Sequence, residues 1–450
     1  MASGIEAVIS HLQSQHPDIK LHTPESPDYE ALRKTYIVSP ARPSVIARPQ
    51  SAEHVQALVR TSVDNGVDFN VRTGGHNCVG RTLVENALLI DMRDITYVDV
   101  SEDKHTARVG GGTLAGTLTK ALGEHGLITP VGTTGTVGYV GWSTFGGYGP
   151  FSTLYGMGVD QIVSAKLVNA KGEIVVATDE LLKGIRGAGG AFGVIVELTV
   201  KVFPLKQILV GTLVYDSSDM KSIWTSLTET SNNLPAALYI QLFATDFPQI
   251  GKVLAAIATW ADDDHEEGRK WIDKLASIGN CIVNTTEAKT LHKYGEDNEK
   301  LVAWGVYGRS YTLSLKSWTK ESVSVLAKYS QSVPGGNAMI GVHSLRSPNL
   351  SEDSNSVFGA RQVHHVIEIV SMTTDPALEA EASTWGQAAL RELKEQDPGN
   401  VLDTAYISLL DQNDVDLRNI YHKHFDTLVA LKKKFDPDNV FKHAVPKIIA

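Results

Sequence analysis

The stretch VRTGGHNCVG, residues 71–80, joins the end of a short apolar segment to two adjacent glycines and a histidine. Gly74 and Gly75 allow the backbone to take positive φ angles and to expose several N–H groups on one side. Such an array of amides suits an anion, typically a phosphate or pyrophosphate, and His76 stands at its rim. An ordinary hairpin loop with a surface histidine has the same short pattern, so the surrounding sequence has to decide between the two interpretations.

Glycine is concentrated in several further segments. They are HTARVGGGTLAGTLTKALGEHGLITPVG (105–132), GTTGTVGYVGWSTFGGYGPFSTLYGMGVD (132–160) and RGAGGAFGVIVELTVKVFP (186–204). Neither the run at 110–116 nor the run at 187–193 has the G-x-G-x-x-G spacing of a Rossmann dinucleotide site. Glycines spread over many loops are expected where backbone wraps an extended dinucleotide from several sides.

In their order and spacing these segments, together with KKFDPDNVFKHAVPKI at 433–448, resemble the vanillyl-alcohol oxidase superfamily of flavoproteins. The likeness is greatest to the branch of the berberine bridge enzyme and 6-hydroxynicotine oxidase. It implies an α+β fold: a PCMH-type FAD-binding domain of two α/β subdomains, and a substrate domain with an antiparallel sheet covered by helices. We expect the FAD-binding domain at 1–206 and 416–450, with its core at about 40–206, and the substrate domain at 207–415.

Local patterns predict several elements of this fold. A strand at 44–47, a helix at 52–65 capped by Ser51 and a strand at 68–72 form a βαβ unit. Other expected elements are a helix at 114–125 ended by Gly126, strands at 209–215, 237–246 and 252–263, and a helix at 416–434. Strands that alternate with amphipathic helices in the second half favour an antiparallel sheet with one covered face.

The composition excludes several classes of protein. The chain has 450 residues, 42% of them hydrophobic and 20% charged, which is typical of globular domains. A net charge of −10 argues against a nucleic-acid partner, because phosphate neutralisation needs a basic face. No apolar run approaches 18 residues, so we expect no membrane span. The first 20 residues are typical of an amphipathic helix and not of a signal peptide, and we expect a cytoplasmic protein.

The resemblance also implies a set of cofactor-binding residues. His76 matches the histidine that carries a covalent bond to the 8α carbon of the flavin, and Thr134 stands where many relatives have a second, cysteinyl link. A threonine hydroxyl cannot replace a thiolate nucleophile at neutral pH, so we expect FAD to be attached through His76 alone. Residues expected around the pyrophosphate are Arg72, Thr73, Gly74, Gly75, Asn77, Thr134, Gly135 and Gly138. Residues expected beside the adenosine and the ring edges are Gly141, Ser143, Gly193 and Val194. Tight-turn geometry is the alternative explanation for any single glycine.

A base is expected on the segment RQVHHVIEIVSM, residues 361–372. Side chains alternate along a strand, so His364 and Glu368 share one face. Glu368 matches the catalytic glutamate of the berberine bridge enzyme, and a carboxylate beside an apolar ring is suited to proton abstraction. A structural salt link is the alternative role for Glu368. Tyr406 and His364 are further catalytic candidates, although Ser408 and Leu409 replace the Asn-Tyr pair that usually follows the position of Tyr406.

The resemblance favours an FAD-dependent oxidase. Such an enzyme takes a hydride from a C–H bond next to a hydroxyl or amine of a small organic molecule, and O₂ accepts the electrons. A bulky apolar secondary metabolite is the expected kind of substrate. Two alternatives stay open at this point: a non-redox cyclase or isomerase that keeps a flavin, and a flavin-binding protein without turnover.

Overall fold

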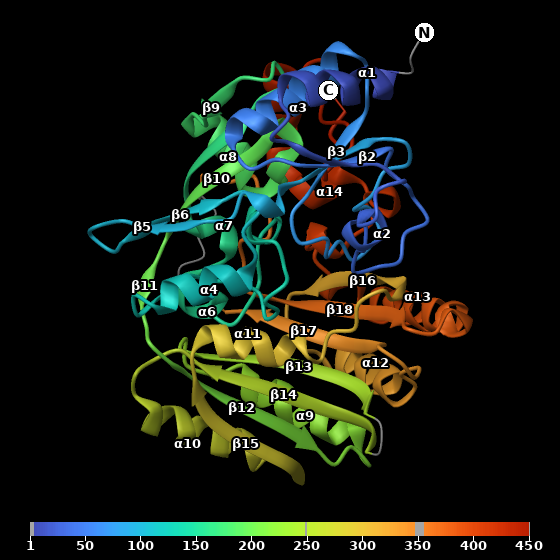
Figure 1. Cartoon of the computed structure of the whole chain (residues 1–450). Helices are drawn as coiled ribbons and strands as arrows, with labels where there is room; N and C mark the ends of the chain where they lie inside the picture. The colour runs from blue at the N-terminus through green and yellow to red at the C-terminus, as the bar shows by residue number, and fades with distance from the viewer. Residues whose placement is uncertain (1–3, 248–249, 347–354, 450) are drawn as a thin grey trace.

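A four-stranded sheet forms the N-terminal end of the computed structural model, which describes residues 4–247, 250–346 and 355–449 (Figure 1). Its strands, in spatial order, are β1 (Lys20–His22), β2 (Val45–Arg48), β4 (Leu88–Asp91) and β3 (Phe69–Arg72). The helices α1 (Gly4–Gln15) and α3 (Ala52–Asp64) share its hydrophobic core. The Ser51 hydroxyl accepts a hydrogen bond from His54 N, so the predicted cap of α3 is confirmed. The predicted βαβ strands are parallel but not adjacent, because β4 lies between them.

A five-stranded antiparallel sheet follows. Its spatial order is β5 (Val98–Val100), β6 (Thr106–Gly110), β10 (Val194–Lys201), β8 (Ile162–Val168) and β9 (Ile174–Val176). The elements packed around it are α4 (Ala115–Gly123), α5 (Tyr139–Thr144), α6 (Ser152–Tyr155), α7 (Gly158–Gln161), α8 (Asp179–Ala188) and the 3-10 turn η2 (Gly189–Phe192). The chain reverses at Gly126, whose φ is +67°, just after α4, as the sequence predicts. A short pair, β7 (Leu127–Ile128) with β11 (Phe203–Pro204), completes this half.

The second half is built on a seven-stranded antiparallel sheet. Its spatial order is β15 (Cys281–Lys289), β12 (Ile208–Tyr215), β14 (Gly251–Trp260), β13 (Leu238–Phe247), β17 (Met339–Leu345), β18 (His364–Thr373) and β16 (Tyr307–Leu315). One face packs on α9 (Met220–Ser231), α10 (His265–Ala276), α12 (Lys320–Gln331) and α13 (Glu379–Gln396). The opposite face turns toward the first half, and α11 (Leu291–Glu299) packs against α4 (Figure 1). The predicted antiparallel sheet with one face covered by helices is therefore confirmed.

The C-terminal segment returns to the first half (Figure 1). Instead of one helix over 416–434, the chain forms α14 (Leu417–Tyr421), a 3-10 turn and α15 (Phe425–Phe435). The break falls at His422, whose φ is +45°, next to Tyr421, whose hydroxyl donates to Gly187 O at 2.9 Å. Farther on, the Phe441 ring meets the Phe69 ring of β3 at a centroid distance of 5.9 Å. These contacts join the C-terminal segment to the first half of the chain.

No helix within the described ranges combines the length and the hydropathy that a membrane crossing requires.

Candidate active site

A cavity of about 410 Å³ lies between the two halves of the chain. This volume falls within the range of small-molecule and cofactor sites, roughly 300–1,000 Å³. Most of the predicted cofactor residues line it: Arg72, Thr73, Gly74, Gly75, His76, Asn77, Thr134, Gly138, Gly141, Gly193 and Val194. From the large sheet come His343 and Glu368, and from the segment after α13 come Tyr406, Ser408 and Leu409.

The glycines leave one wall of the cavity as bare backbone. A Cβ added to Gly74 would lie 2.3 Å from Gly138 N, and one added to Gly138 would lie 2.5 Å from Gly74 N. Hence the loop after β3 and the loop before α5 approach more closely than any side chain permits. At Gly141 and Gly190, by contrast, an added Cβ would meet nothing within 4 Å, because both positions face open cavity space. Two closely packed loops that line such space with backbone fit an extended dinucleotide such as FAD.

Arg72 lies beneath the Gly74–Gly75 turn and is only 3% exposed. Its Nη1 and Nη2 atoms donate to Leu32 O and Lys34 O at 2.5 and 2.6 Å. Burial, and then the neighbouring Arg93, lower the pKa of Arg72 to about 10, so it stays charged at neutral pH. The guanidinium thus fixes the loop and places a positive charge behind it, instead of holding a phosphate with both Nη atoms.

Three predicted site residues, Gly135, Ser143 and His364, are not among the residues that line the cavity. Gly135 packs against α4, where its carbonyl accepts from Gly116 N at 2.7 Å. The buried Ser143 hydroxyl donates within α5 to Val140 O at 3.3 Å. His364 is fully buried and contacts Tyr148, which itself lines the cavity. These positions can act on a bound molecule only through their neighbours.

His76 is enclosed by aromatic rings. Its ring stacks on Tyr36 at a centroid distance of 5.2 Å and meets the edge of Trp304 at 4.7 Å. Its Nε2 atom lies 2.9 Å from the Thr136 hydroxyl. Burial, with a smaller effect of Arg72, lowers the pKa of His76 to about 4. The imidazole is therefore neutral at physiological pH, as a nitrogen nucleophile must be.

Cys78 also lines the cavity, two residues beyond His76. Its thiol lies 3.3 Å from His76 O, and burial raises its pKa. A thiol that keeps its proton is a poor nucleophile. Thr134, at the position of the missing cysteinyl link, lines the cavity and is 9% exposed.

Glu368 reaches the cavity from β18, on the face that strand alternation predicts. Its Oε2 atom lies 3.5 Å from His343 Nε2 of the neighbouring strand β17. Gly341 stands directly opposite Glu368 in the register and has no side chain, so the carboxylate can lean toward His343. His343 was not among the predicted residues. Its segment, MIGVHSL, shows alternation but no motif, so local sequence gave no signal for it.

Tyr406 and His364 belong to one aromatic group with Tyr148. The Tyr148 and Tyr406 rings meet at a centroid distance of 4.9 Å. His364 Nδ1 lies 2.7 Å from Gln362 O, a pure acceptor, so this nitrogen carries the proton and Nε2 accepts from the Tyr148 hydroxyl at 2.9 Å. Burial raises the pKa of Tyr406, which argues against a tyrosinate at neutral pH.

Burial keeps three histidines near the site neutral. It lowers the pKa of His76 and His364 to about 4 each and that of His365 to about 3. An unfolded histidine binds its proton at about pH 6.5, so the unfolded state gains protons first as the pH falls. We therefore expect the free energy of unfolding to decrease as the pH falls from about 6.5 toward 4, as thermal denaturation at a series of pH values would measure. His365→Gln should flatten this dependence, and an unchanged slope would contradict the contribution of His365.

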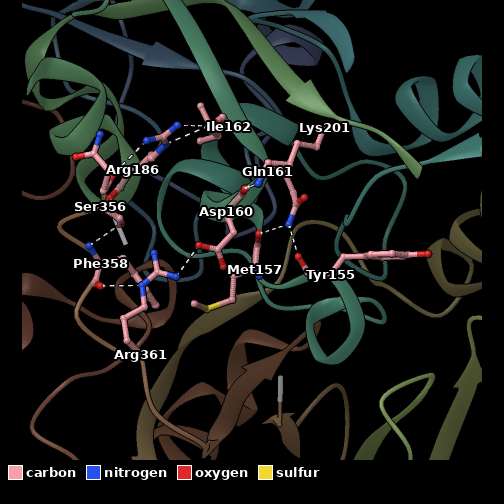
Figure 2. Close-up of polar contacts among 11 residues, drawn as sticks. Tyr155, Met157, Asp160, Gln161, Ile162, Arg186, Lys201, Ser356, Phe358 and Arg361 are labelled. Carbon is pink, nitrogen blue, oxygen red and sulfur yellow. Dashed lines mark hydrogen bonds and ion pairs between the residues drawn. The ribbon is translucent and has the colours of Figure 1, made fainter. Parts of the chain in front are cut away.

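A network of polar contacts anchors the segment that leads into β18 (Figure 2). Arg361, whose side chain is 5% exposed, donates from Nη1 to Asp160 Oδ1 at 2.6 Å, and its Nε donates to Phe358 O at 3.3 Å. Asp160 Oδ2 accepts from Met157 N at 3.0 Å, and Lys201 Nζ donates to Asp160 O at 2.9 Å. The strand that carries Glu368 is thereby fixed to the first half of the chain, close to its starting point.

A cavity with backbone on one wall and a carboxylate-bearing antiparallel sheet on the other fits a flavoprotein oxidoreductase. Comparison with known proteins agrees. A family model described as FAD binding domain matches residues 43–178, and one described as Berberine and berberine like matches residues 412–446.

Similar proteins include the FAD-linked oxidoreductase aurO of Gibberella zeae. It is 32% identical over 450 residues, which cover 99% of this chain and 88% of aurO. The (R)-6-hydroxynicotine oxidase of Paenarthrobacter nicotinovorans is 34% identical over 209 residues, or 45% of this chain and 46% of that enzyme. Among solved structures, wild-type BBE-like 1 of Physcomitrella patens superposes with a TM-score of 0.84 at 20% identity, over 98% of this chain and 97% of that one.

The chain belongs to the FAD-linked oxidoreductases of the vanillyl-alcohol oxidase superfamily, in the berberine-like branch. The resemblance drawn from the sequence and the predicted fold class are thereby confirmed.

Proposed function

We propose that the chain is an FAD-dependent oxidase that removes a hydride from a C–H bond next to a hydroxyl or amine of a small organic molecule. The observation that carries this proposal is the position of Glu368, the one carboxylate among the described residues that line the cavity. When bound, FAD supplies the hydride acceptor and passes the electrons on to O₂. The name of the similar 6-hydroxynicotine oxidase supports an oxidase, and that of aurO supports an FAD-linked oxidoreductase.

The residues of the chain have separate roles in this proposal. The loops around Gly74, Gly138 and Gly193 hold FAD through their backbone. Glu368 takes the proton of the substrate hydroxyl or amine as the adjacent C–H bond breaks. Tyr406, which stays neutral, can donate a hydrogen bond but not act as the base.

The cavity wall contains several apolar side chains. Among them are Val140, Phe145, Tyr148 and Leu409. Such side chains fit a bulky apolar substrate. We infer a secondary metabolite as the kind of molecule that such a cavity accepts.

The direct test is a metabolite screen without oxygen, followed by the visible absorbance of the bound flavin. A substrate of the oxidase bleaches the flavin, and admitting air restores the colour. Product formation while the flavin stays oxidised would support the non-redox cyclase or isomerase instead. If no compound bleached the flavin and none was converted, a flavin-binding protein without turnover would be the remaining interpretation.

The proposal includes covalent attachment of FAD through His76. His76 would hold the flavin through Nδ1: if Nε2–H donates to the Thr136 hydroxyl, this tautomer leaves the Nδ1 lone pair free. After acid precipitation we expect yellow colour in the pellet for the native protein and in the supernatant for His76→Ala. His443→Ala is the matched control, since His443 also lines the cavity.

The control protein should keep its colour in the pellet. Release of native flavin by acid would overturn the linkage without affecting FAD binding. Retention in His76→Ala would mean that another residue forms the bond.

A further inference from the structure

Three polar side chains from three adjacent strands lie in a row on the cavity side of the large sheet. Tyr239 of β13 places its hydroxyl oxygen 2.6 Å from His343 Nδ1 of β17. His343 Nε2 lies 3.5 Å from Glu368 Oε2 of β18. In the register His343 pairs with Gln241, two residues from Tyr239, so all three side chains leave the sheet on the same face.

At the inner end of this row, the Tyr239 hydroxyl keeps its proton and can donate a hydrogen bond. Tyr239 is 1% exposed, and burial above all, with Tyr294 and Glu368 adding to it, raises its pKa well above the ordinary value. Among the described residues His343 is the one hydrogen-bond partner of the Tyr239 hydroxyl. If Nδ1–H donated to the phenol instead, the buried Tyr239 O–H would have no acceptor among the described residues. We therefore assign the donor role to Tyr239 and the acceptor role to His343 Nδ1.

At the outer end of the row, the contact between His343 and Glu368 follows from the tautomer of His343. An imidazole that accepts at Nδ1 carries its proton at Nε2, and Nε2 is the nitrogen that faces Glu368. The 3.5 Å separation is long for a hydrogen bond, but such contacts often shorten only when substrate is bound.

We propose that His343 is a positioning residue for Glu368: Tyr239 fixes its tautomer, and its Nε2–H holds the carboxylate directed into the cavity. The consequence for catalysis rests on the proposed function, in which Glu368 is the base. A neutral donor has one advantage over a cation here. It orients the carboxylate without the strong charge pairing that makes a base weak.

The other titratable groups near Glu368 do not provide a positive charge for its carboxylate. Besides burial, the negative charge of Glu368 raises the pKa of Tyr36, Cys78, Tyr239 and Tyr406. Burial raises the pKa of each of these four groups, so all of them are neutral and none brings a positive charge to the carboxylate.

The tautomer can be measured directly on the FAD-loaded protein with ¹⁵N-labelled histidine rings. The signals of His343 are those that disappear in His343→Gln. We expect a pyridine-type shift for Nδ1 and a pyrrole-type shift for Nε2 at neutral pH. In Tyr239→Phe the two tautomers should mix, so the two shifts should move toward each other.

Ser344→Ala is the matched control. Ser344 Oγ lies 2.8 Å from His365 Nδ1, an equivalent pair between β17 and β18 on the opposite face of the sheet. The control should shift His365 and leave His343 unchanged. A proton on His343 Nδ1, an imidazolium, or unchanged His343 signals in Tyr239→Phe would overturn the proposal.

A second measurement follows the carboxylate itself by its ¹³C signal, identified by its loss in Glu368→Gln. Removing the donor with His343→Leu should move this ¹³C signal at neutral pH, because the carboxylate loses a hydrogen bond. His343→Gln, which keeps an N–H donor, should restore most of the shift. An unmoved ¹³C signal in His343→Leu would overturn the proposal. Neither measurement needs a substrate, so a failed search for one would count against the oxidase alone.

Discussion

Glu368→Gln is expected to slow reduction of the bound flavin by about 10²–10⁴-fold, because that is the usual contribution of a positioned general base. The amide has nearly the same shape as the carboxylate but cannot take a proton. Its neighbour His343, 3.5 Å away, can still donate to the amide oxygen, so the cavity should keep its form. We therefore expect the flavin spectrum and the affinity for substrate to change little.

The measurement is rapid mixing of the FAD-loaded protein with a substrate found in the screen, in the absence of oxygen. Glu287→Gln serves as the control, since Glu287 is an exposed carboxylate of β15, at the far edge of the same sheet. It should reduce its flavin at the native rate. If Glu368→Gln stayed within about a factor of two of native, the base would have to be another group, because losing a true base costs far more.

Local sequence was sufficient for features that depend on neighbours along the chain. Ser51 was recognisable as a helix cap because its hydroxyl meets an N–H three residues later. Gly126 marked the end of α4 because the turn there needs a positive φ. Alternation placed Glu368 on the cavity face because successive side chains of a strand point to opposite sides.

Features that depend on sheet order could not be predicted in this way. Tyr239 and Glu368 meet His343 only because β17 lies between β13 and β18, whereas the chain visits other strands and helices between β13 and β17. No local pattern records that order. Gly135 and Ser143 were expected in the site because they lie in a glycine-rich run. Instead, Gly135 packs against α4, and the Ser143 hydroxyl donates a hydrogen bond within α5.

The helix expected at 416–434 shows a third limit. Its residues have good helical spacing, yet the chain breaks at His422. The Tyr421 hydroxyl donates a hydrogen bond to Gly187 O, and α15 packs against α8. Tertiary contacts of this kind outweigh propensities of a few tenths of a kcal/mol per residue, roughly the range among ordinary residues.

The C-terminal segment contains a buried ion pair whose loss should have the largest effect on stability. Lys432 and Asp436 have side chains that are 2% and 0% exposed, and they lie 2.5 Å apart. Lys432 also donates to Ala191 O at 3.1 Å, in the turn before Gly193 of the cavity wall. Asp436 accepts from Val440 N at 2.7 Å and from Phe441 N at 3.0 Å.

Asp436→Ala is therefore expected to lower the free energy of unfolding by about 3–5 kcal/mol, because it leaves a buried ammonium without its counter-charge. It should also weaken retention of FAD, since the wall beside Gly193 loses its anchor. Urea denaturation, followed by tryptophan and flavin fluorescence, measures both effects. Removing residues 435–450 should go further and yield protein without flavin.

The control is the exposed ion pair between Lys434 of α15 and Glu180 of α8, whose side chains are 57% and 52% exposed. Lys434→Ala should cost no more than about 1 kcal/mol, as solvent-exposed ion pairs do. A second variant separates charge from packing. In Lys432→Met/Asp436→Leu no buried charge is left unpaired, so much of the stability should return, but the N–H groups of Val440 and Phe441 stay without their acceptor. If Asp436→Ala were as mild as Lys434→Ala, or if the truncated chain kept its flavin, the C-terminal segment would not be part of the FAD-binding domain.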